Sequence, residues 1–231
     1  MTTEQRNLVV IGIIIAMAAI GGLVAILVSS SNATPTVTDY SNIPSARQSD
    51  GGFVLGSPDA PITIVEFADF LCPHCQEYEA TTGRFIQTYV ITGMARYEYR
   101  MFPVIDPTLS TYTANLAECS DAQLSGSFWS AKGLLFQYAA ARRIDPATIT
   151  RTFANDMQLD YGTLVQCVGQ ADQVQTDALL GRSLGVSGTP AVMVRYGNGA
   201  PEWITFNGQI YNRGGVPFDV LSAVVQAAQA Q

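Results

Sequence analysis

Cys72 and Cys75 form a C-x-x-C motif, the spacing in this chain that points most directly to chemistry. Pro73, between them, favours a helix that starts at the motif. Unpaired N–H groups and the helix dipole then stabilise the thiolate of Cys72, the form of cysteine that attacks disulfides. His74 adds partial or full positive charge beside it. The pattern predicts thiol–disulfide exchange, with Cys72 as the nucleophile and Cys75, about one turn further in, as the resolving thiol.

Two other roles of a C-x-x-C motif fit this sequence less well. A zinc site needs two more ligands. The single histidine of the chain lies inside the motif, and Cys119 and Cys167 are isolated cysteines 48 residues apart. A structural Cys72–Cys75 disulfide would close a very small ring, which gains little loop-closure stabilisation. We therefore expect no metal and no cofactor.

The elements that position the motif alternate between strand and helix. Ile62–Phe67 is a β-branched run that predicts a buried strand. The helix from Pro73 carries apolar side chains on one face and ends at Gly93, and Arg96–Phe102 alternates as a second strand. This order predicts a βαβ unit with parallel strands and the motif directly after the first strand.

The rest of the chain predicts a block of helices followed by a second pair of strands. Helical periodicity runs from about Ser110 to Leu184. Ala191–Tyr196 predicts a strand, Gly197-Asn198-Gly199 a turn, and Trp203–Ile210 a second, antiparallel strand. An amphipathic helix from Phe218 to Ala228 completes the pattern. The fold class is therefore α/β, in the order βαβ, helical insert, ββα.

An apolar block near the N-terminus predicts a transmembrane anchor. Leu8–Val28 carries no charge and is long enough to cross a hydrocarbon core of about 30 Å, whereas the apolar part of a secretory signal is shorter. Residues 1–7 then form a short cytoplasmic N-terminus, which Arg6 mildly favours. The alternative is a signal cleaved after Ala33, and either way the remainder is exported. Residues 29–50 have the composition of a flexible linker.

The charge of the chain argues against a nucleic-acid partner. Its net charge is −7, with 12 Lys and Arg residues among 231 and no basic cluster. Phosphate binding requires such a basic surface. The length fits one domain of about 100–200 residues with an appended segment.

The residues around the motif resemble a known family. Phe70-Leu71-Cys72-Pro73-His74-Cys75 after Val65-Glu66-Phe67 is similar to the active site of the DsbA family of thioredoxin-fold disulfide oxidoreductases. The similarity extends over about residues 52–231. It implies a thioredoxin-like domain at 51–231 with a helical insert at about 108–185, where the helical block is predicted.

Two further positions match that family. The stretch that ends in Thr189-Pro190 resembles the loop that holds a cis-proline opposite the dithiol, which implies that both residues bind the substrate backbone. Without the C-x-x-C motif, an ordinary Gly-Pro turn would be preferred. Glu66 matches a buried carboxyl that can accept the proton of Cys75. The alternative is a glutamate at a strand end whose carboxyl is satisfied by backbone or water.

The remaining cysteines, Cys119 and Cys167, both fall in the helical block. In an oxidising compartment, two such cysteines more often pair than stay free. Some relatives in the broader family are similar in having a second, non-catalytic bridge. We therefore expect a structural disulfide that ties one helix of the insert to a later one.

The resemblance implies an enzyme that oxidises cysteine pairs in exported polypeptides. It also implies re-oxidation by a membrane quinone reductase of the DsbB or vitamin-K-epoxide-reductase type. Pro73 and His74 favour this direction. A thiol reductase or isomerase is an alternative, because Thr189 before the cis-proline also resembles isomerases. A non-catalytic peptide-binding module is a further alternative, against which the intact dithiol argues.

Overall fold

The computed structural model of the protein describes residues 39–230. The predicted cytoplasmic segment 1–7, the anchor at 8–28 and the cleavage point at Ala33 lie outside the described residues. Within residues 39–230, no helix combines the length and the apolar character needed to cross a membrane.

From Ile62 onward, strands and helices follow one another in the predicted order, and two short strands that we do not predict precede them. The strands are β1 (Ser45–Arg47), β2 (Phe53–Leu55), β3 (Ile62–Ala68), β4 (Arg96–Met101), β5 (Ala191–Tyr196), β6 (Glu202–Phe206) and β7 (Gln209–Tyr211). The helices are α2 (Pro73–Phe85), the π-helix η1 (Ile86–Val90), α3 (Pro107–Gln123), α4 (Phe128–Ala140), α5 (Ile149–Asp156), α6 (Tyr161–Val168), α7 (Gln173–Ser183) and α8 (Phe218–Gln229).

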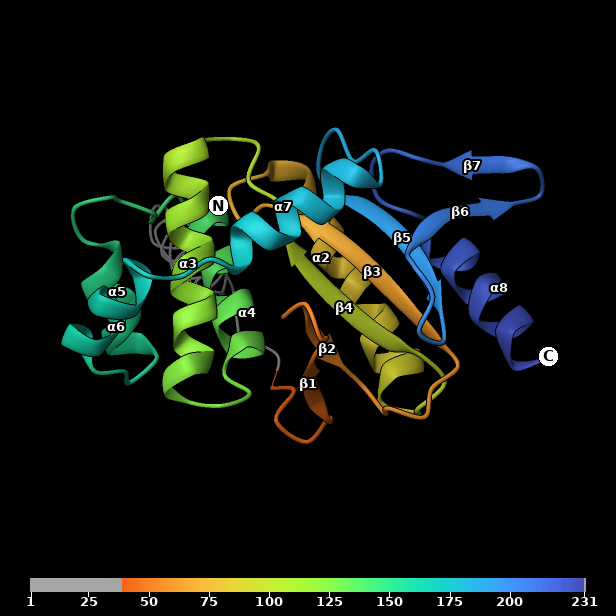
Figure 1. The fold of residues 1–231 in the computed structure, drawn as a ribbon, viewed down its shortest axis with the longest axis horizontal. Coiled ribbons are helices and arrows are strands. Elements are labelled where there is room, and N and C mark those ends of the chain that lie inside the picture. The colour runs from red at the N-terminus through yellow and green to blue at the C-terminus, as the bar shows by residue number, and fades with distance from the viewer. Residues whose placement is uncertain (1–38, 231) are drawn as a thin grey trace, which may run out of the picture. The chain divides into compact units, whose positions relative to one another are not determined.

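The strands of the described chain form one mixed sheet in the order β1-β2-β4-β3-β5-β6-β7 (Figure 1). β3 is parallel to β4 and antiparallel to β5. Every residue of β3 is buried, as expected for a β-branched run covered on both faces. Because α2 connects β3 to β4, the predicted βαβ unit is confirmed. The register places Glu66 between Tyr99 of β4 and Val192 of β5.

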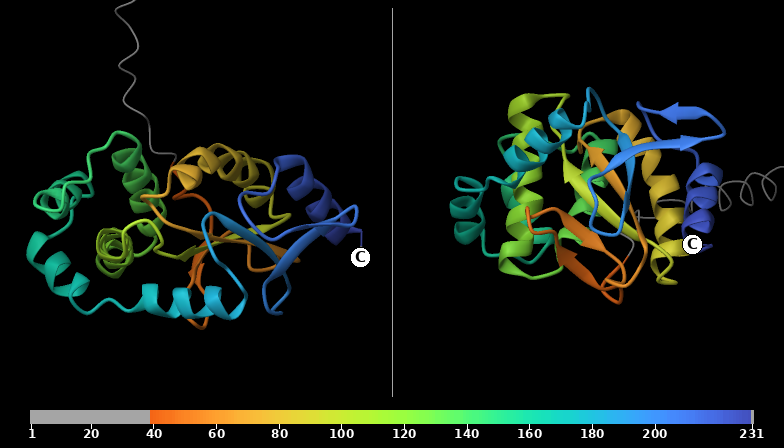
Figure 2. Two further views of the ribbon diagram at one scale, coloured as in Figure 1. Left: turned by 90° about the horizontal axis from the view of Figure 1, so that it is seen from above. Right: turned by 45° about the vertical axis from the view of Figure 1, so that its right-hand side comes forward.

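Helices cover both faces of this sheet (Figure 2). α2 and α8 lie on one face, and α7 lies on the other. Between α7 and the sheet lies one buried apolar cluster, to which Phe67, Phe102 and Ala178 of α7 belong. This cluster separates the sheet from solvent on that side. The main core lies on the opposite face, where α2, α4 and α8 pack.

The helices α3 to α7 occupy the stretch between β4 and β5 where we predict the insert. α3 begins at Asp106, whose side chain accepts hydrogen bonds from the N–H groups of Thr108 and Leu109 at 3.0 and 2.9 Å. Cys119 of α3 and Cys167 of α6 form a disulfide, with their Cα atoms 5.7 Å apart. This pairing is as predicted.

Two local features differ from the sequence expectation. β1 lies inside the stretch 29–50 that we predict as flexible linker, and it pairs with β2, so the folded part starts before residue 51. Trp203–Ile210 is not a single strand but the hairpin β6–β7. Its turn is Asn207-Gly208, with φ of 49° and 78°, and an Asn-Gly pair is the residue combination that such a hairpin turn favours.

Replacing both insert cysteines, Cys119→Ala with Cys167→Ala, should lower the free energy of unfolding by about 2–4 kcal/mol. The disulfide removes chain entropy from an unfolded loop of 48 residues. Urea unfolding of the variant and the parent, each with its C-x-x-C pair reduced, measures the difference. An unchanged unfolding midpoint would contradict this account of the bridge.

Candidate functional site

Cys72 and Cys75 lie at the start of α2, after the turn that follows β3. Asp69 shapes this turn, because its carbonyl accepts from the Cys72 N–H at 3.0 Å and its Oδ1 accepts from the Leu71 N–H at 2.9 Å. Cys72 has extended backbone angles, and Pro73 follows at the first helical position, as predicted. Both cysteines are reduced and buried, with 3% and 0% of their surface exposed.

Hydrogen bonds at the sulfur of Cys72 stabilise its thiolate. The thiol of Cys75 makes the largest contribution, and the backbone N–H groups of Cys75 and His74 at the start of α2 add to it. Together these donors outweigh burial, which opposes the charge, and lower the pKa of Cys72 to about 5. At neutral pH the nucleophile is therefore ionised.

Cys75 has the opposite character. Its pKa is raised far above the ordinary range of a thiol, first because it donates to Cys72, then because it is buried, and then because the Glu66 carboxylate repels a second negative charge. The charge of the pair is thus confined to Cys72, which is the asymmetry expected of a nucleophile and a resolving thiol. Residues 39–230 contain no cluster of three or more His, Cys, Asp or Glu side chains that could hold a metal ion.

The loop before β5 faces the dithiol. The Thr189–Pro190 peptide bond is cis, which confirms the prediction for this loop. When Cys72 is protonated, its thiol donates a hydrogen bond to the carbonyl oxygen of Thr189, with the sulfur 3.4 Å away. The start of α2 and the cis-proline loop therefore meet at the reactive sulfur.

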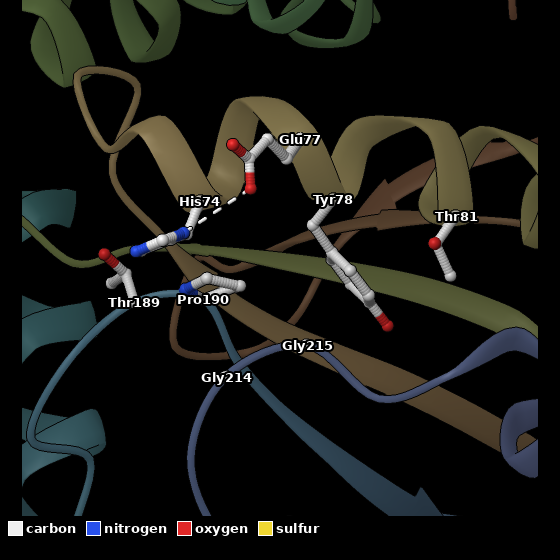
Figure 3. A pocket seen from close by; sticks show the side chains of 8 residues that line it. All are labelled: His74, Glu77, Tyr78, Thr81, Thr189, Pro190, Gly214 and Gly215. Atoms are coloured by element: carbon white, nitrogen blue, oxygen red, sulfur yellow. Dashed lines mark hydrogen bonds and ion pairs between the residues drawn. The ribbon is translucent and has the colours of Figure 1, made fainter.

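An open groove of about 470 Å³ runs beside this meeting point (Figure 3). Its lining residues are His74, Glu77, Tyr78, Thr81, Thr189, Pro190, Gly214 and Gly215. The Tyr78 hydroxyl donates to the Val216 carbonyl at 2.8 Å, which fixes the far wall against α2. Gly215 is so close to the Tyr78 ring that an added Cβ would come within 2.3 Å of it. His74 and Glu77 extend from α2 above Pro190, and the His74 side chain is 78% exposed.

Glu66 lies in β3, close enough to Cys75 for its charge to raise the pKa of that thiol. It is 1% exposed. Its Oε2 accepts hydrogen bonds from Tyr97 at 2.7 Å and Thr82 at 3.0 Å, whereas Oε1 has no partner within the described chain. Burial raises the pKa of Glu66 to about 7. Glu66 is buried as predicted, and its role as a proton acceptor stays a prediction.

Sequence reasoning missed two charged residues near Glu66 and one wall of the groove. Lys132 of α4 and Glu79 of α2 form an ion pair, and both act electrostatically on Glu66. A lysine within an apolar helical run was a signal that could have been noticed. The wall at Gly214 had no such signal, because it depends on a bridge to Ala191 that forms only when the chain returns after β7.

Comparisons with known proteins agree with this architecture. A family model described as Thioredoxin matches residues 48–199. The chain is 30% identical to the Na(+)/H(+) antiporter NhaA 3 of Salinispora tropica over 149 residues. This matched region covers 63% of this chain and 22% of that protein. The chain is also 36% identical to the probable disulfide bond formation protein D of Bacillus cereus over 76 residues. This matched region covers 32% of this chain and 35% of that protein. The matched region therefore spans about a third or less of these curated relatives.

The solved structure of α-DsbA1 from Wolbachia pipientis is similar in fold. The TM-score is 0.64 at 20% sequence identity, and the match covers 84% of this chain and 96% of that one. Together with the family model, this likeness shows a mixed α/β, thioredoxin-like fold with a helical insert.

Titration of the reduced protein should reveal a thiolate with a midpoint near pH 5, because the donors around Cys72 hold its pKa at about 5. Thiolate absorption near 240 nm measures it. Cys75→Ala removes the largest of these donors and should move the midpoint upward, toward the usual value of about 8.5. Cys72→Ala is the control and should lack the acidic transition. A midpoint near 8.5 in the unmodified protein would show that the helix start does not stabilise the thiolate.

Proposed function

The chain belongs to the thioredoxin family, and on that premise we propose that it is an extracytoplasmic thiol–disulfide oxidoreductase that oxidises cysteine pairs in exported proteins. The observation that carries the proposal is the contrast between Cys72, whose thiolate is stabilised, and Cys75, which keeps its proton. The name of the Bacillus cereus protein attributes disulfide bond formation to one relative, which supports the same chemistry here.

The reaction uses both cysteines and leaves its electrons on the enzyme. A substrate thiolate attacks the Cys72 sulfur of the Cys72–Cys75 disulfide, and Cys75 leaves as a thiolate that takes a proton from Glu66. The second substrate thiolate then attacks the substrate sulfur of the mixed disulfide, and Cys72 leaves as a thiolate. The substrate gains a disulfide, and its two electrons remain in the reduced dithiol. In the reverse direction, Glu66 accepts the proton of Cys75.

The acidity of Cys72 favours the oxidising direction. A stabilised thiolate is a good leaving group, and it stabilises the reduced protein relative to the disulfide form. Because the pKa is lowered to about 5, this stabilisation is complete above the ordinary thiol pKa of about 8.5 and disappears as the pH falls through 5. Measured against an ordinary thiol couple such as glutathione, the disulfide form should therefore be a stronger oxidant at neutral pH than in acid.

The groove supplies a binding site for an extended substrate segment. Thr189 and Pro190 line the groove next to Cys72, where a substrate peptide would pair with their main chain in strand-like fashion. His74 on the opposite wall is exposed and follows Cys72 by two residues in sequence. Substrate cysteines would approach Cys72 between these two walls.

Recycling requires a partner that removes two electrons. The proposal assigns this to a membrane quinone reductase of the DsbB or vitamin-K-epoxide-reductase type, which would pass the electrons of the reduced dithiol to its own disulfide. The apolar stretch 8–28 would hold the domain at the membrane on the exported side. Cleavage near Ala33 would instead release it.

The equilibrium potential of the Cys72–Cys75 couple against glutathione decides between oxidase and reductase. We expect a value well above that of thioredoxin, about −270 mV, because the reduced form is stabilised at Cys72. A value at or below about −270 mV would instead favour the reductase or isomerase alternative, which Thr189 before Pro190 keeps open. Cys72→Ser should abolish oxidation of a reduced dithiol peptide, and full activity in this variant would overturn the enzymatic proposal.

Glu66→Gln should slow release of a peptide thiol from a Cys72 mixed disulfide, in which Cys75 must lose its proton. General-base assistance is worth about 10²–10⁴-fold, so a loss of at least about tenfold is expected. In the parent, release should accelerate as the pH rises through about 7, where Glu66 ionises. The variant should lose this dependence in stopped-flow measurements. Identical rates for both proteins across pH 5–8 would remove Glu66 from the mechanism.

A further inference from the structure

A second groove, the α3–α7 groove, lies between these two helices of the insert, which pack beside each other (Figure 1). Its volume is about 400 Å³, and it shares no lining residue with the groove beside Cys72. The lining residues recur at a spacing of three or four on both helices, so one face of each helix forms a wall. They include Pro107, Thr111 and Asn115 of α3, and Gln175, Ala178 and Arg182 of α7.

Contacts between the walls fix the course of the groove. At one end, the Gln173 N–H donates to Glu118 Oε2 at 3.2 Å, which holds the start of α7 beside the second half of α3. At the other end, a Cβ added to Gly181 would come within 2.7 Å of the Phe102 ring, so the last turn of α7 packs directly after the end of β4. Pro103 lines the groove there. The groove therefore runs from the start of α7 to the segment that joins β4 to α3.

Opposite charges mark the two ends of the groove. Asp172, the residue before the first turn of α7, lines one end, and Arg182, in the last turn, lines the other. Both residues are exposed, and within residues 39–230 neither forms an ion pair. The ten residues of helix between them span about 15 Å at a rise of about 1.5 Å per residue. An extended chain covers that length in about four to five residues.

Asn115, in the α3 wall, has an acceptor that lacks a donor. The residue is 9% exposed, and its Nδ2 donates to the Val168 carbonyl at 3.4 Å. Because a carbonyl can only accept, this contact assigns the nitrogen of the amide. The Oδ1 atom has no partner within the described chain. Native proteins rarely leave a buried polar atom unsatisfied. A main-chain N–H of a bound chain, or a water that it holds, would supply the missing donor.

We propose that the α3–α7 groove binds an extended polypeptide segment that carries a basic and an acidic side chain about four residues apart. The basic side chain pairs with Asp172 and the acidic one with Arg182, while the main chain donates toward Asn115. Pro107 and Ala178 provide apolar contact between these points. The assignment of this segment to an exported substrate rests on the function proposed above, because that function supplies the polypeptide.

The Arg182 end of the groove leads toward the dithiol. From Arg182 the chain continues through a short loop to the cis Pro190. On the other wall, the residues that follow Pro103 donate their N–H groups to Asp69, and the Asp69 carbonyl accepts from the Cys72 N–H. A substrate chain bound at Cys72 would therefore reach the groove with a segment outside its reacting cysteine.

Calorimetric titration of the full chain with a cysteine-free peptide measures binding to the groove. The probe is acetyl-Gly-Lys-Ala-Thr-Ala-Glu-Gly-amide, used together with its reversed sequence. Asp172→Asn and Arg182→Gln should each raise the Kd of the tighter peptide by about two- to fivefold, because exposed ion pairs contribute little. Arg182→Glu should weaken that peptide further and should bind the peptide in which Lys replaces Glu.

Arg142→Gln is the matched control. Arg142 is an exposed arginine elsewhere in the insert, after α4, and it does not line the groove. The change alters the net charge by the same amount as Arg182→Gln, so the Kd should stay at the parent value. Equal Kd values in the parent, Asp172→Asn, Arg182→Gln and Arg182→Glu would overturn the inference. A dimer in sedimentation that Arg182→Glu dissociates would also overturn it, in favour of a second copy of this chain.

Oxidation kinetics test whether the groove serves the proposed reaction. For a reduced dithiol peptide that carries the same segment, Arg182→Gln should raise KM by about two- to fivefold and leave kcat unchanged. A dithiol peptide without the segment should show no difference. An unchanged KM for both would overturn the assignment to substrates. Cys72→Ser should bind the cysteine-free peptide as the parent does. If the parent fails to oxidise either dithiol peptide while binding remains charge-dependent, the proposed function fails and the binding site stands.

Discussion

The free-energy cost of holding charge away from water governs the centre of this protein. Cys72 is almost fully buried, yet its thiolate is stable because a neighbouring thiol and the first amide groups of α2 donate to it. Cys75 donates its proton to Cys72, and buried Glu66 receives hydrogen bonds at only one of its two oxygens, so the pKa of each group is raised. Cys72 therefore carries a negative charge, whereas Cys75 and Glu66 resist ionisation. In the proposed exchange reaction, this difference makes Cys72 the attacking thiolate and keeps the proton on Cys75.

Buried charged side chains lie on both faces of β4, and they are paired differently on the two faces. Tyr97 and Tyr99 point toward the dithiol side, where one carboxyl oxygen of Glu66 is left unpaired. The alternate residue Arg100 points to the opposite face, and its guanidinium contacts the carboxylates of Glu98, Asp177 and Asp50 at 2.6–2.9 Å. Full pairing makes the Arg100 cluster a structural joint between the sheet, α7 and the β1–β2 region. Incomplete pairing leaves Glu66 free to change its proton.

Features that depend on a few neighbouring residues could be predicted from the sequence. The C-x-x-C pair at a helix start and the β3–α2–β4 order are of this kind, because residue type and spacing determine them locally, whereas the cis Pro190 follows from the resemblance to a known family. β1 has three exposed residues and no apolar alternation, so only its pairing with β2 defines it. Lys132 follows Glu79 by 53 residues in sequence. Their contact exists only because α4 folds back onto α2, which no local pattern encodes.

The helical insert is joined to the dithiol by two separate connections, so it is more than a cover for the sheet. The segment that leads into α3 donates its Val104 and Ile105 N–H groups to Asp69 Oδ2 at 2.8 and 2.9 Å. The same Asp69 holds the backbone of Cys72. Further along, the Cys119–Cys167 bridge ties α3 to α6, α3 packs on α4, and α4 carries Lys132 to Glu79. A movement of the insert relative to α2 would thus alter both the turn that positions Cys72 and the charges that act on Glu66.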